Sequence, residues 1–171
     1  YQYRLQQSFG DNVGAMVVME RDTGKVIALV SVPGYDPNVF IAPSYTAYSI
    51  AEITQDPLNP MYNRATQGVY PPGSVFKIIT MAAALEAGVY QPTSSYYCDS
   101  YWRELTGWVG EDWTVSHGDG PSGQLTLQEG LMRSCNPWFL HIGLDLFRQK
   151  GDKFISDLAR GFGLGNATGI E

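Results

Sequence analysis

Residues 71–88 of the chain read PPGSVFKIITMAAALEAG. Two prolines and a glycine precede Ser74, and the run of good helix formers that follows stops at Gly88. The stretch therefore predicts a helix from about Ser74 to Ala87, with Gly88 as its C-terminal cap. Lys77 lies one turn after Ser74 and shares its face of the helix. The pair is either a polar cap with a solvated lysine, or a nucleophile beside its base.

The rest of the chain predicts one β-hairpin followed by a mostly helical body. Residues 14–20 and 25–32 are rich in β-branched and apolar side chains around an Asp-Thr-Gly turn, which is typical of a hairpin. Short strand-like pieces such as SSYYC fall between residues 89 and 123. Four further helices are expected. One covers about residues 44–55, one begins at the capping box of Thr126 and Glu129, and one has Pro137 in its first turn. The last has Asp152 as its N-cap and ends at Gly161.

Composition limits the class of protein. A chain of 171 residues, 44% of them apolar, suits one globular domain. The net charge of −6 argues against nucleic-acid binding, which needs clustered Lys and Arg. The sequence contains no run of about 20 apolar residues, the length that a membrane-spanning helix needs. No signal peptide is visible, but the chain starts without a methionine, so upstream targeting could be missing.

The two cysteines, Cys98 and Cys135, form neither a CxxC motif nor a metal pattern with the two histidines. Two separated cysteines are more often buried free thiols than a disulfide. We therefore expect both to be unpaired, with a disulfide as the alternative in an oxidising compartment. Cys135 is expected to be packed rather than reactive, because no partner base is apparent.

Ser74 could act as a nucleophile without a histidine. In the first turn of a helix its hydroxyl lies near unpaired N–H groups, which can stabilise an oxyanion at a carbonyl under attack. Partial burial would lower the pKa of Lys77, so that its neutral amine could act as base. This chemistry needs no metal or cofactor, and none is expected. His117, in the loop SHGDG, is interpreted as structural.

Ser134-Cys135-Asn136 is a second candidate motif, placed between two helical runs. A hydroxyl and a carboxamide there could point into a cleft, relay a proton and bind an amide carbonyl. The alternative is that they only cap the adjacent helices. Each motif is weak alone, since chance matches to S-x-x-K are common. Together, in this order and each at a helix junction, they favour a catalytic site.

S-x-x-K with an S-D-N-type element and K-T-G is the signature of penicillin-binding proteins and class A β-lactamases. Three stretches closely resemble the class B, monofunctional penicillin-binding proteins, and matches run from about Val13 to Glu171. They are YNRATQGVYPPGSVFKIITMAAALEAG, VVMERDTGKVIALVSVPGYDPNVF and EGLMRSCNPWFLHIG. The resemblance implies a D,D-transpeptidase that cross-links peptidoglycan stem peptides through a serine acyl-enzyme and is acylated by β-lactams.

The resemblance also implies a role for each matching residue. Ser74 would be the acylated nucleophile, with its backbone N–H as half of the oxyanion hole, and Lys77 the general base. Ser134 would take part in proton transfer to the leaving amine. Asn136 would hold the substrate amide and help to orient Lys77. Ser74, Ser134 and Asn136 would thus also bind substrate.

No K-T-G occurs in the chain. In the family, that element lies on a strand of a five-stranded antiparallel sheet, binds the substrate carboxylate and supplies the second oxyanion N–H. The implied fold class is α/β (α+β), β-lactamase/transpeptidase-like. Residues 1–171 would be the N-terminal portion of one such domain, with the leading hairpin and the mostly helical part. Losing one oxyanion donor costs about 3–4 kcal/mol, so this chain alone is expected to be nearly inactive.

The implied partners are stem peptides ending in D-Ala-D-Ala, β-lactams and, for the parent protein, a membrane glycosyltransferase. The parent would be anchored by an upstream helix and act on the extracytoplasmic face, periplasmic or outer, of the cell membrane, with residues 1–171 themselves soluble.

Three alternatives remain open. An acylated β-lactam sensor, or another non-catalytic binding domain, would show slow acyl-enzyme hydrolysis without use of an acceptor. A D,D-carboxypeptidase or a β-lactamase would be recognised by its products, and the context YPPGSVFKIIT argues against the β-lactamase. The last alternative is a helical domain with coincidental motifs.

Overall fold

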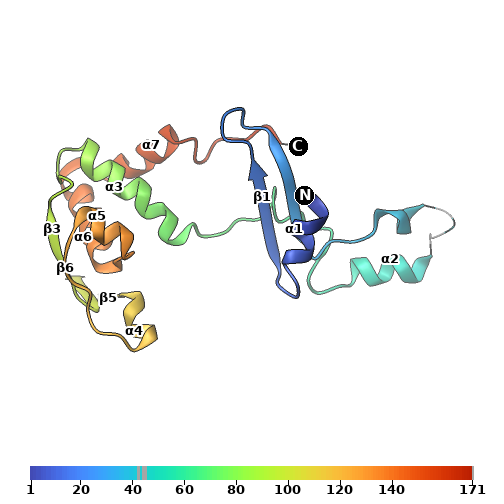
Figure 1. Ribbon diagram of the computed structural model, residues 1–171, viewed down its shortest axis with the longest axis horizontal. Coiled ribbons are helices and arrows are strands. Elements are labelled where there is room, and N and C mark those ends of the chain that lie inside the picture. Colours follow the sequence, from blue (N-terminus) through green and yellow to red (C-terminus); the bar gives the residue numbers. More distant parts are fainter. Residues whose placement is uncertain (42, 44–45, 171) are drawn as a thin grey trace. The chain divides into compact units, whose positions relative to one another are not determined.

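The computed structural model describes residues 1–41, 43 and 46–170. They form two compact units, residues 1–70 with 169–170, and residues 71–168. Figure 1 colours the elements of both units along the sequence.

The first unit is built on a hairpin. Its elements are α1 (Gln2–Ser8), β1 (Gly14–Met19), β2 (Val26–Val32), the 3-10 helix η1 (Pro37–Phe40) and α2 (Ala47–Thr54). β1 and β2 pair antiparallel from Gly14 opposite Val32 to Met19 opposite Val26, with an irregularity in register after Val18. The predicted hairpin around the Asp-Thr-Gly turn is therefore confirmed.

Of the two α-helices described in this unit, one is predicted from the sequence and one is not. α1 is not predicted, and it is held by side-chain bonds to β2. The Gln2 side-chain amide donates to the Leu29 carbonyl, and its oxygen accepts from the Leu29 N–H at 2.9 Å. α2 matches the helix expected over residues 44–55, of which residues 44–45 lie outside the described part. Thr46 caps α2 by accepting the Ser49 N–H at 3.0 Å.

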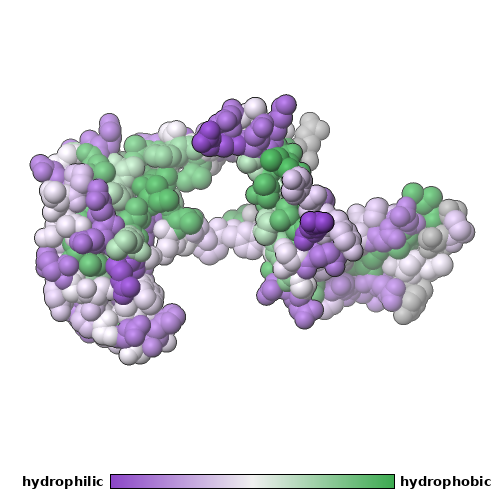
Figure 2. Space-filling view, viewed as in Figure 1, coloured by the Kyte–Doolittle hydropathy of each residue, from purple (hydrophilic) through white to green (hydrophobic). Residues whose placement is uncertain are grey.

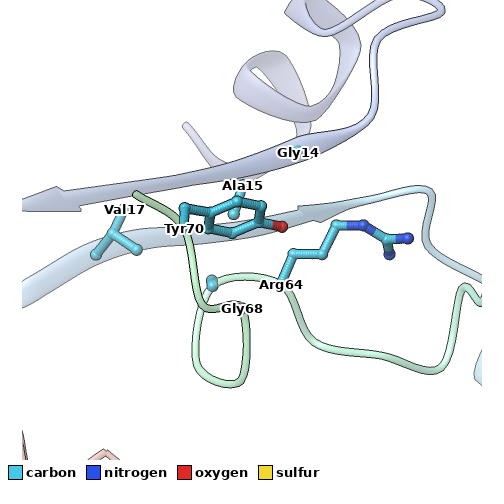
Figure 3. Close-up of a pocket in the computed structure, with 7 residues that line it drawn as sticks. Gly14, Ala15, Val17, Arg64, Gly68 and Tyr70 are labelled. Carbon is cyan, nitrogen blue, oxygen red and sulfur yellow. The ribbon is translucent and has the colours of Figure 1, made fainter. Parts of the chain in front are cut away.

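A pocket of about 410 Å³ lies beside β1, and Figure 3 shows the Tyr70 ring and the Arg64 side chain next to the strand. Arg64 is the charged residue of its lining. Its guanidinium donates to the carbonyls of Tyr62 and Asn59 at 3.3 and 3.2 Å. Arg64 therefore holds its own loop, and we assign this pocket a structural role.

The second unit is mostly helical, as predicted. Its elements are η2 (Gly73–Phe76), α3 (Lys77–Glu86), β3 (Ser95–Cys98), β4 (Tyr101–Leu105), β5 (Trp108–Glu111), α4 (Trp113–His117), β6 (Gly123–Thr126), α5 (Leu127–Met132), α6 (Asn136–Lys150) and α7 (Phe154–Gly161). Its core is formed by nine buried residues, Ala83, Ala84, Cys98, Leu127, Cys135, Trp138, Phe139, Ile142 and Leu146. α6 contributes four of these residues, and α3 and α5 together contribute three. The two cysteines lie at the end of β3 and just before α6, so the core is built around α6.

The strands of this unit form two short antiparallel pairs. β3 pairs with β6, and β4 pairs with β5. The strand expected at SSYYC is β3, whereas the β4–β5 hairpin, which turns at Gly107 (φ 82°), is not predicted. This hairpin leads directly into α4, and its last residues reach the N-terminus of α6. It thereby becomes part of the candidate site.

Local helix signals are mostly confirmed. The box of Thr126 and Glu129 caps α5 in both directions, and Pro137 lies in the first turn of α6. Asp152 as N-cap is wrong, because α7 begins at Phe154 after Lys153, whose φ and ψ are already right-handed helical. Within the described ranges, no helix has both the length and the apolar character needed to cross a membrane.

Hydrophobic side chains gather on the visible face over α3 and α7 (Figure 2). Val75, Ile78 and Phe162 belong to this patch and are 67%, 54% and 57% exposed. They border a pocket of about 290 Å³. A continuous exposed apolar patch is typical of a contact surface.

Candidate active site

Ser74 lies in the 3-10 turn η2, which continues directly into α3 at Lys77. Gly73 adopts φ +58°, a conformation that favours glycine, and it turns the chain into the helix. The predicted helix therefore begins as a tighter 3-10 turn. The Ser74 side chain is exposed, at the N-terminal end of this helical run.

The Lys77 amine is the centre of a cluster of oxygens. Its Nζ donates to Asn136 Oδ1 at 2.5 Å, to the Ser134 carbonyl at 2.6 Å and to Ser134 Oγ at 3.0 Å. Two motifs 57 residues apart in the sequence thus meet at one atom. The Lys77 backbone N–H donates to the Ser74 carbonyl within the helical turn. Among the described residues no hydrogen bond joins the Ser74 hydroxyl to the Lys77 amine, which is turned towards the second motif.

The segment Ser134–Asn136 adopts a specific turn rather than a simple pair of helix caps. α5 ends before Arg133, Ser134 has φ +56°, and α6 begins at Asn136. A positive φ is uncommon for a residue other than glycine, and it needs support from the surrounding structure. Asn136 donates through Nδ2 to the Glu111 carbonyl at 2.9 Å, which fixes its oxygen towards Lys77.

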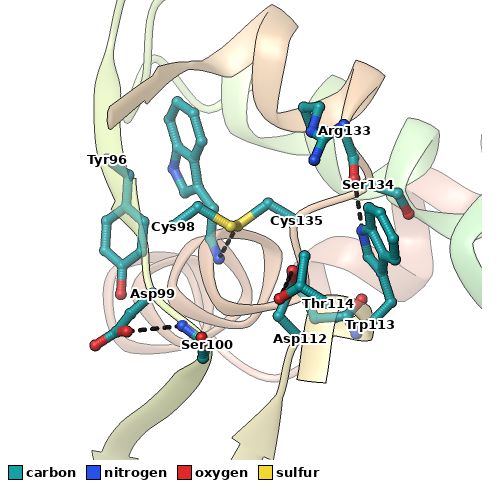
Figure 4. The surroundings of a disulfide bond; sticks show 12 residues. Tyr96, Cys98, Asp99, Ser100, Asp112, Trp113, Thr114, Arg133, Ser134 and Cys135 are labelled. Atoms are coloured by element: carbon teal, nitrogen blue, oxygen red, sulfur yellow. Dashed lines mark hydrogen bonds between the residues drawn. A yellow bond between two sulfur atoms is a disulfide. The ribbon is translucent and has the colours of Figure 1, made fainter. Parts of the chain in front are cut away.

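Cys98 and Cys135 form a disulfide bond, so the expectation of two free thiols is wrong. Both residues are completely buried, and their Cα atoms lie 6.2 Å apart, within the usual range for a disulfide. The bond joins the end of β3 to the residue before α6 (Figure 4). The two cysteines are 37 residues apart in the sequence, and the packing of β3 against α6 brings them together.

Burial lowers the pKa of Lys77, and the negative charge of Asp112 partly opposes this by raising it. The ammonium also lies 5.7 Å from the centre of the Phe139 ring. A desolvated lysine with a lowered pKa has a larger neutral fraction near neutral pH, as a general base requires. Lys77 is half-buried, so the condition under which it could act as a base is met.

A pocket of about 280 Å³ opens beside Lys77. It is lined by Lys77, Trp108, Gly110, Glu111, Asn136, Phe139 and Leu140. A Cβ at Gly110 would lie 2.4 Å from Leu140 Cδ1 and 3.1 Å from a Trp108 ring atom, so a larger residue there would displace the Leu140 side chain. This wall is not predicted from the sequence, because it depends on the β4–β5 hairpin, which is itself not predicted.

The remaining candidates have structural roles. His117 ends α4, and its Nδ1 lies 3.0 Å from the Trp113 carbonyl within the same helix. One group of possible metal ligands occurs among the described residues, namely Cys98, Asp112 and Cys135. Its sulfur atoms are already joined in the disulfide, so they are not thiolate ligands.

In a comparison with protein families, residues 14–171 match the family described as the penicillin binding protein transpeptidase domain. The chain belongs to this family. The resemblance to class B penicillin-binding proteins is thereby confirmed, and so is the transpeptidase-like α+β fold class.

Individual relatives agree with this assignment. Peptidoglycan D,D-transpeptidase PbpA of Mycobacterium tuberculosis is 35% identical over 164 residues, covering 93% of this chain and 32% of the relative. The solved imipenem acyl-enzyme complex of penicillin-binding protein A from M. tuberculosis superposes with a TM-score of 0.79 at 34% identity, covering 96% of this chain and 38% of that one. A peptidoglycan synthase complex that coordinates polymerization and crosslinking contains a chain 32% identical, with a TM-score of 0.76, covering 98% of this chain and 28% of that one. This transpeptidase chain spans about a third of the length of the curated PbpA relative.

Proposed function

We propose that residues 1–171 are the N-terminal portion of the transpeptidase domain of a peptidoglycan D,D-transpeptidase, which forms a serine acyl-enzyme and is a target of β-lactams. Ser74 is the nucleophile and Lys77 the general base. Ser134 transfers a proton to the leaving amine, and Asn136 holds the substrate amide and orients Lys77.

The observation that carries the proposal is the environment of the Lys77 amine. Lys77 follows Ser74 by one turn, and its Nζ is bound by Ser134 and Asn136. Burial lowers its pKa. A helix cap with a solvated lysine would have neither these two partners nor this burial. The arrangement supports a base that can work near neutral pH beside an exposed serine.

The proposed reaction has two halves. The neutral Lys77 amine takes the proton of Ser74 Oγ as this oxygen attacks the carbonyl of the penultimate D-alanine. Ser134 then passes its hydroxyl proton to the amine of the terminal D-alanine, which leaves as its C–N bond breaks, and Lys77 returns the proton it holds to Ser134. In the second half the amine of another stem peptide attacks the ester carbonyl and loses a proton through Ser134 to Lys77. The bond from the carbonyl carbon to Ser74 Oγ then breaks, and Lys77 returns the proton to Ser74. The backbone N–H of Ser74 stabilises the oxyanion in both halves.

The resemblance supplies the surroundings of this reaction. The family's K-T-G element, which is absent from residues 1–171, binds the substrate carboxylate and gives the second oxyanion donor. We therefore expect residues 1–171 alone to be acylated very slowly. The whole protein would act on the extracytoplasmic face of the cell membrane, and we propose a membrane glycosyltransferase as its partner.

The test is product analysis with the full-length protein. It is incubated with a donor peptide ending in D-Ala-D-Ala, with and without an excess of an acceptor amine, and the products are separated by mass spectrometry. A transpeptidase gives the cross-linked peptide, and Ser74→Ala gives none. The matched control is Ser116→Ala, which removes an exposed serine hydroxyl in α4.

The other outcomes would contradict the proposal. Release of D-alanine with hydrolysis alone would indicate a carboxypeptidase. Rapid hydrolysis of penicillin would indicate a β-lactamase. A stable acyl-enzyme that ignores the acceptor would indicate a sensor.

A further inference from the structure

Asp112 is a buried carboxylate next to the candidate site. It follows β5, and only 2% of its surface is exposed. Its Oδ1 accepts the backbone N–H of Asn136 at 2.8 Å, and its Oδ2 accepts the Thr114 hydroxyl at 3.1 Å. Burying a charge is costly unless it is hydrogen-bonded or paired. The chain therefore keeps this carboxylate buried against the first turn of α6.

The neighbours of Asp112 bind the same turn from both sides. The Glu111 carbonyl accepts Asn136 Nδ2, and Trp113 Nε1 donates to the Arg133 carbonyl at 2.9 Å. Figure 4 shows Trp113 pointing to Arg133 beside the Cys98–Cys135 disulfide, with Asp112 and Thr114 next to them. The three consecutive residues 111–113 thus hold the chain on both sides of Ser134, at Arg133 and at Asn136.

This support is needed because the turn is strained. Ser134 has φ +56°, and both its carbonyl and its hydroxyl must face Lys77. Asn136 must do so as well. A residue held in a sparsely populated conformation persists only where its surroundings determine it. A negative charge at the start of α6 also interacts favourably with the helix dipole.

We propose that Asp112 is a positioning residue for acylation of Ser74: its carboxylate fixes Asn136 at the start of α6, and its negative charge acts on the Lys77 amine. This inference rests on the proposed function, in which Lys77 is the base. The role is indirect, since Asp112 acts through Asn136 and Lys77.

Two opposing effects meet at Lys77. Burial lowers its pKa, and the charge of Asp112 raises it. Glu111 is the other titratable residue in the pocket beside Lys77. Removing the charge of Asp112 removes the opposing effect, so the pKa of Lys77 falls further.

Asp112→Asn separates charge from hydrogen bonding. The asparagine oxygen can still accept the Asn136 N–H, and its amide can donate to the Thr114 hydroxyl, which can also act as an acceptor. Asp112→Ala removes both the charge and the hydrogen bonds. Asp145→Asn is the matched control. Asp145 also lies on α6 and accepts the Tyr90 hydroxyl at 2.7 Å, but its oxygens are not among those that bind the Lys77 amine.

The experiment follows the titration of Lys77 by NMR in the full-length protein, labelled with ¹³C at lysine Cε. The Lys77 signal is assigned by its loss in Lys77→Arg. We expect the midpoint to move to lower pH in Asp112→Asn and to stay in place in Asp145→Asn. An unchanged midpoint in Asp112→Asn, or an equal shift in the control, overturns the proposed effect of charge. The titration needs no acylation, so failure here is distinct from failure of Ser74 to react with penicillin.

The rate of penicillin acylation tests positioning. Asp112→Asn should remain active, with the acidic limb of its pH profile moved to lower pH. Asp112→Ala should lose roughly 100-fold, the scale expected for a small misplacement of catalytic groups. Wild-type acylation by Asp112→Ala would overturn the positioning role. If Asp112→Ala does not fold, a wild-type pH profile in Asp112→Asn would still contradict the proposal.

Discussion

The Lys77 amine donates to Ser134 Oγ at 3.0 Å, which joins the start of α3 to the turn before α6. The same turn is tied to β3 by the Cys98–Cys135 disulfide. The oxygens around the amine are therefore held by elements far apart in the sequence. The Lys77 hydrogen bonds and the disulfide are separate contacts of this turn, so the role of Lys77 in acylation and the stability of the fold can be tested with different variants.

Lys77→Arg should abolish acylation while keeping the positive charge. Arginine is not deprotonated in proteins, so it cannot accept the Ser74 proton. We expect a loss of at least about 100-fold in the second-order rate of penicillin acylation, the contribution typical of a general base. The rate is measured with a fluorescent penicillin, and melting temperatures show whether the variant is folded. An acylation rate close to wild type would rule out Lys77 as the base.

The acylation rate should rise with pH through the pKa of Lys77. Because burial lowers this pKa, the half-maximal rate should occur below 10.5, the ordinary value for lysine. The sign follows from the mechanism, since the reactive form is the neutral amine, which is lost as pH falls. A stopped-flow series over pH gives the midpoint. A rate that falls as pH rises through this range would contradict the assignment.

Loss of the disulfide should reduce stability. Cys98 and Cys135 are 37 residues apart, and closing a loop of this length contributes about 4 kcal/mol in the chain-entropy model. We expect Cys98→Ser with Cys135→Ser to lower the free energy of urea unfolding by roughly 2–4 kcal/mol. Reductant should lower the stability of the wild type and leave the double variant unchanged. Equal stability of the two proteins without reductant would argue against the bond.

Two helical glycines should respond in opposite ways to alanine. At Gly130 a Cβ would lie 2.5 Å from a Trp138 ring atom, whereas at Gly143 it would meet no atom within 4 Å. Gly130→Ala should therefore destabilise the protein by about 1–3 kcal/mol through overpacking. Gly143→Ala should stabilise it by up to about 1 kcal/mol, because alanine favours a helix. Thermal unfolding of both variants measures the difference, and an unchanged or raised stability of Gly130→Ala would contradict the packing of α5 on Trp138 of α6.

Local sequence signals predicted the elements that depend on local chemistry. The hairpin of β1 and β2, the helix after Ser74 and the box of Thr126 and Glu129 were all predicted, because each is determined by residues within a few positions. The pairing of the motifs at Ser74 and Ser134 was predicted through their resemblance to a known family.

The missed features depend on contacts between distant residues. Gln2 stabilises α1 by bonding to Leu29, 27 residues away. Asp112 binds Asn136, 24 residues away, and no local pattern marks it as part of the site. The disulfide was predicted wrongly for the same reason, since spacing alone does not show that two buried cysteines meet.

The most direct test of the central claim is the intact mass of the full-length protein after incubation with excess benzylpenicillin. We predict one covalent penicilloyl adduct, which peptide mapping places on Ser74 and which Ser74→Ala does not form. Residues 1–171 alone, treated in the same way, should form little adduct. An adduct that persists in Ser74→Ala, or a full-length protein that gains no mass, would contradict the assignment of Ser74 as the nucleophile.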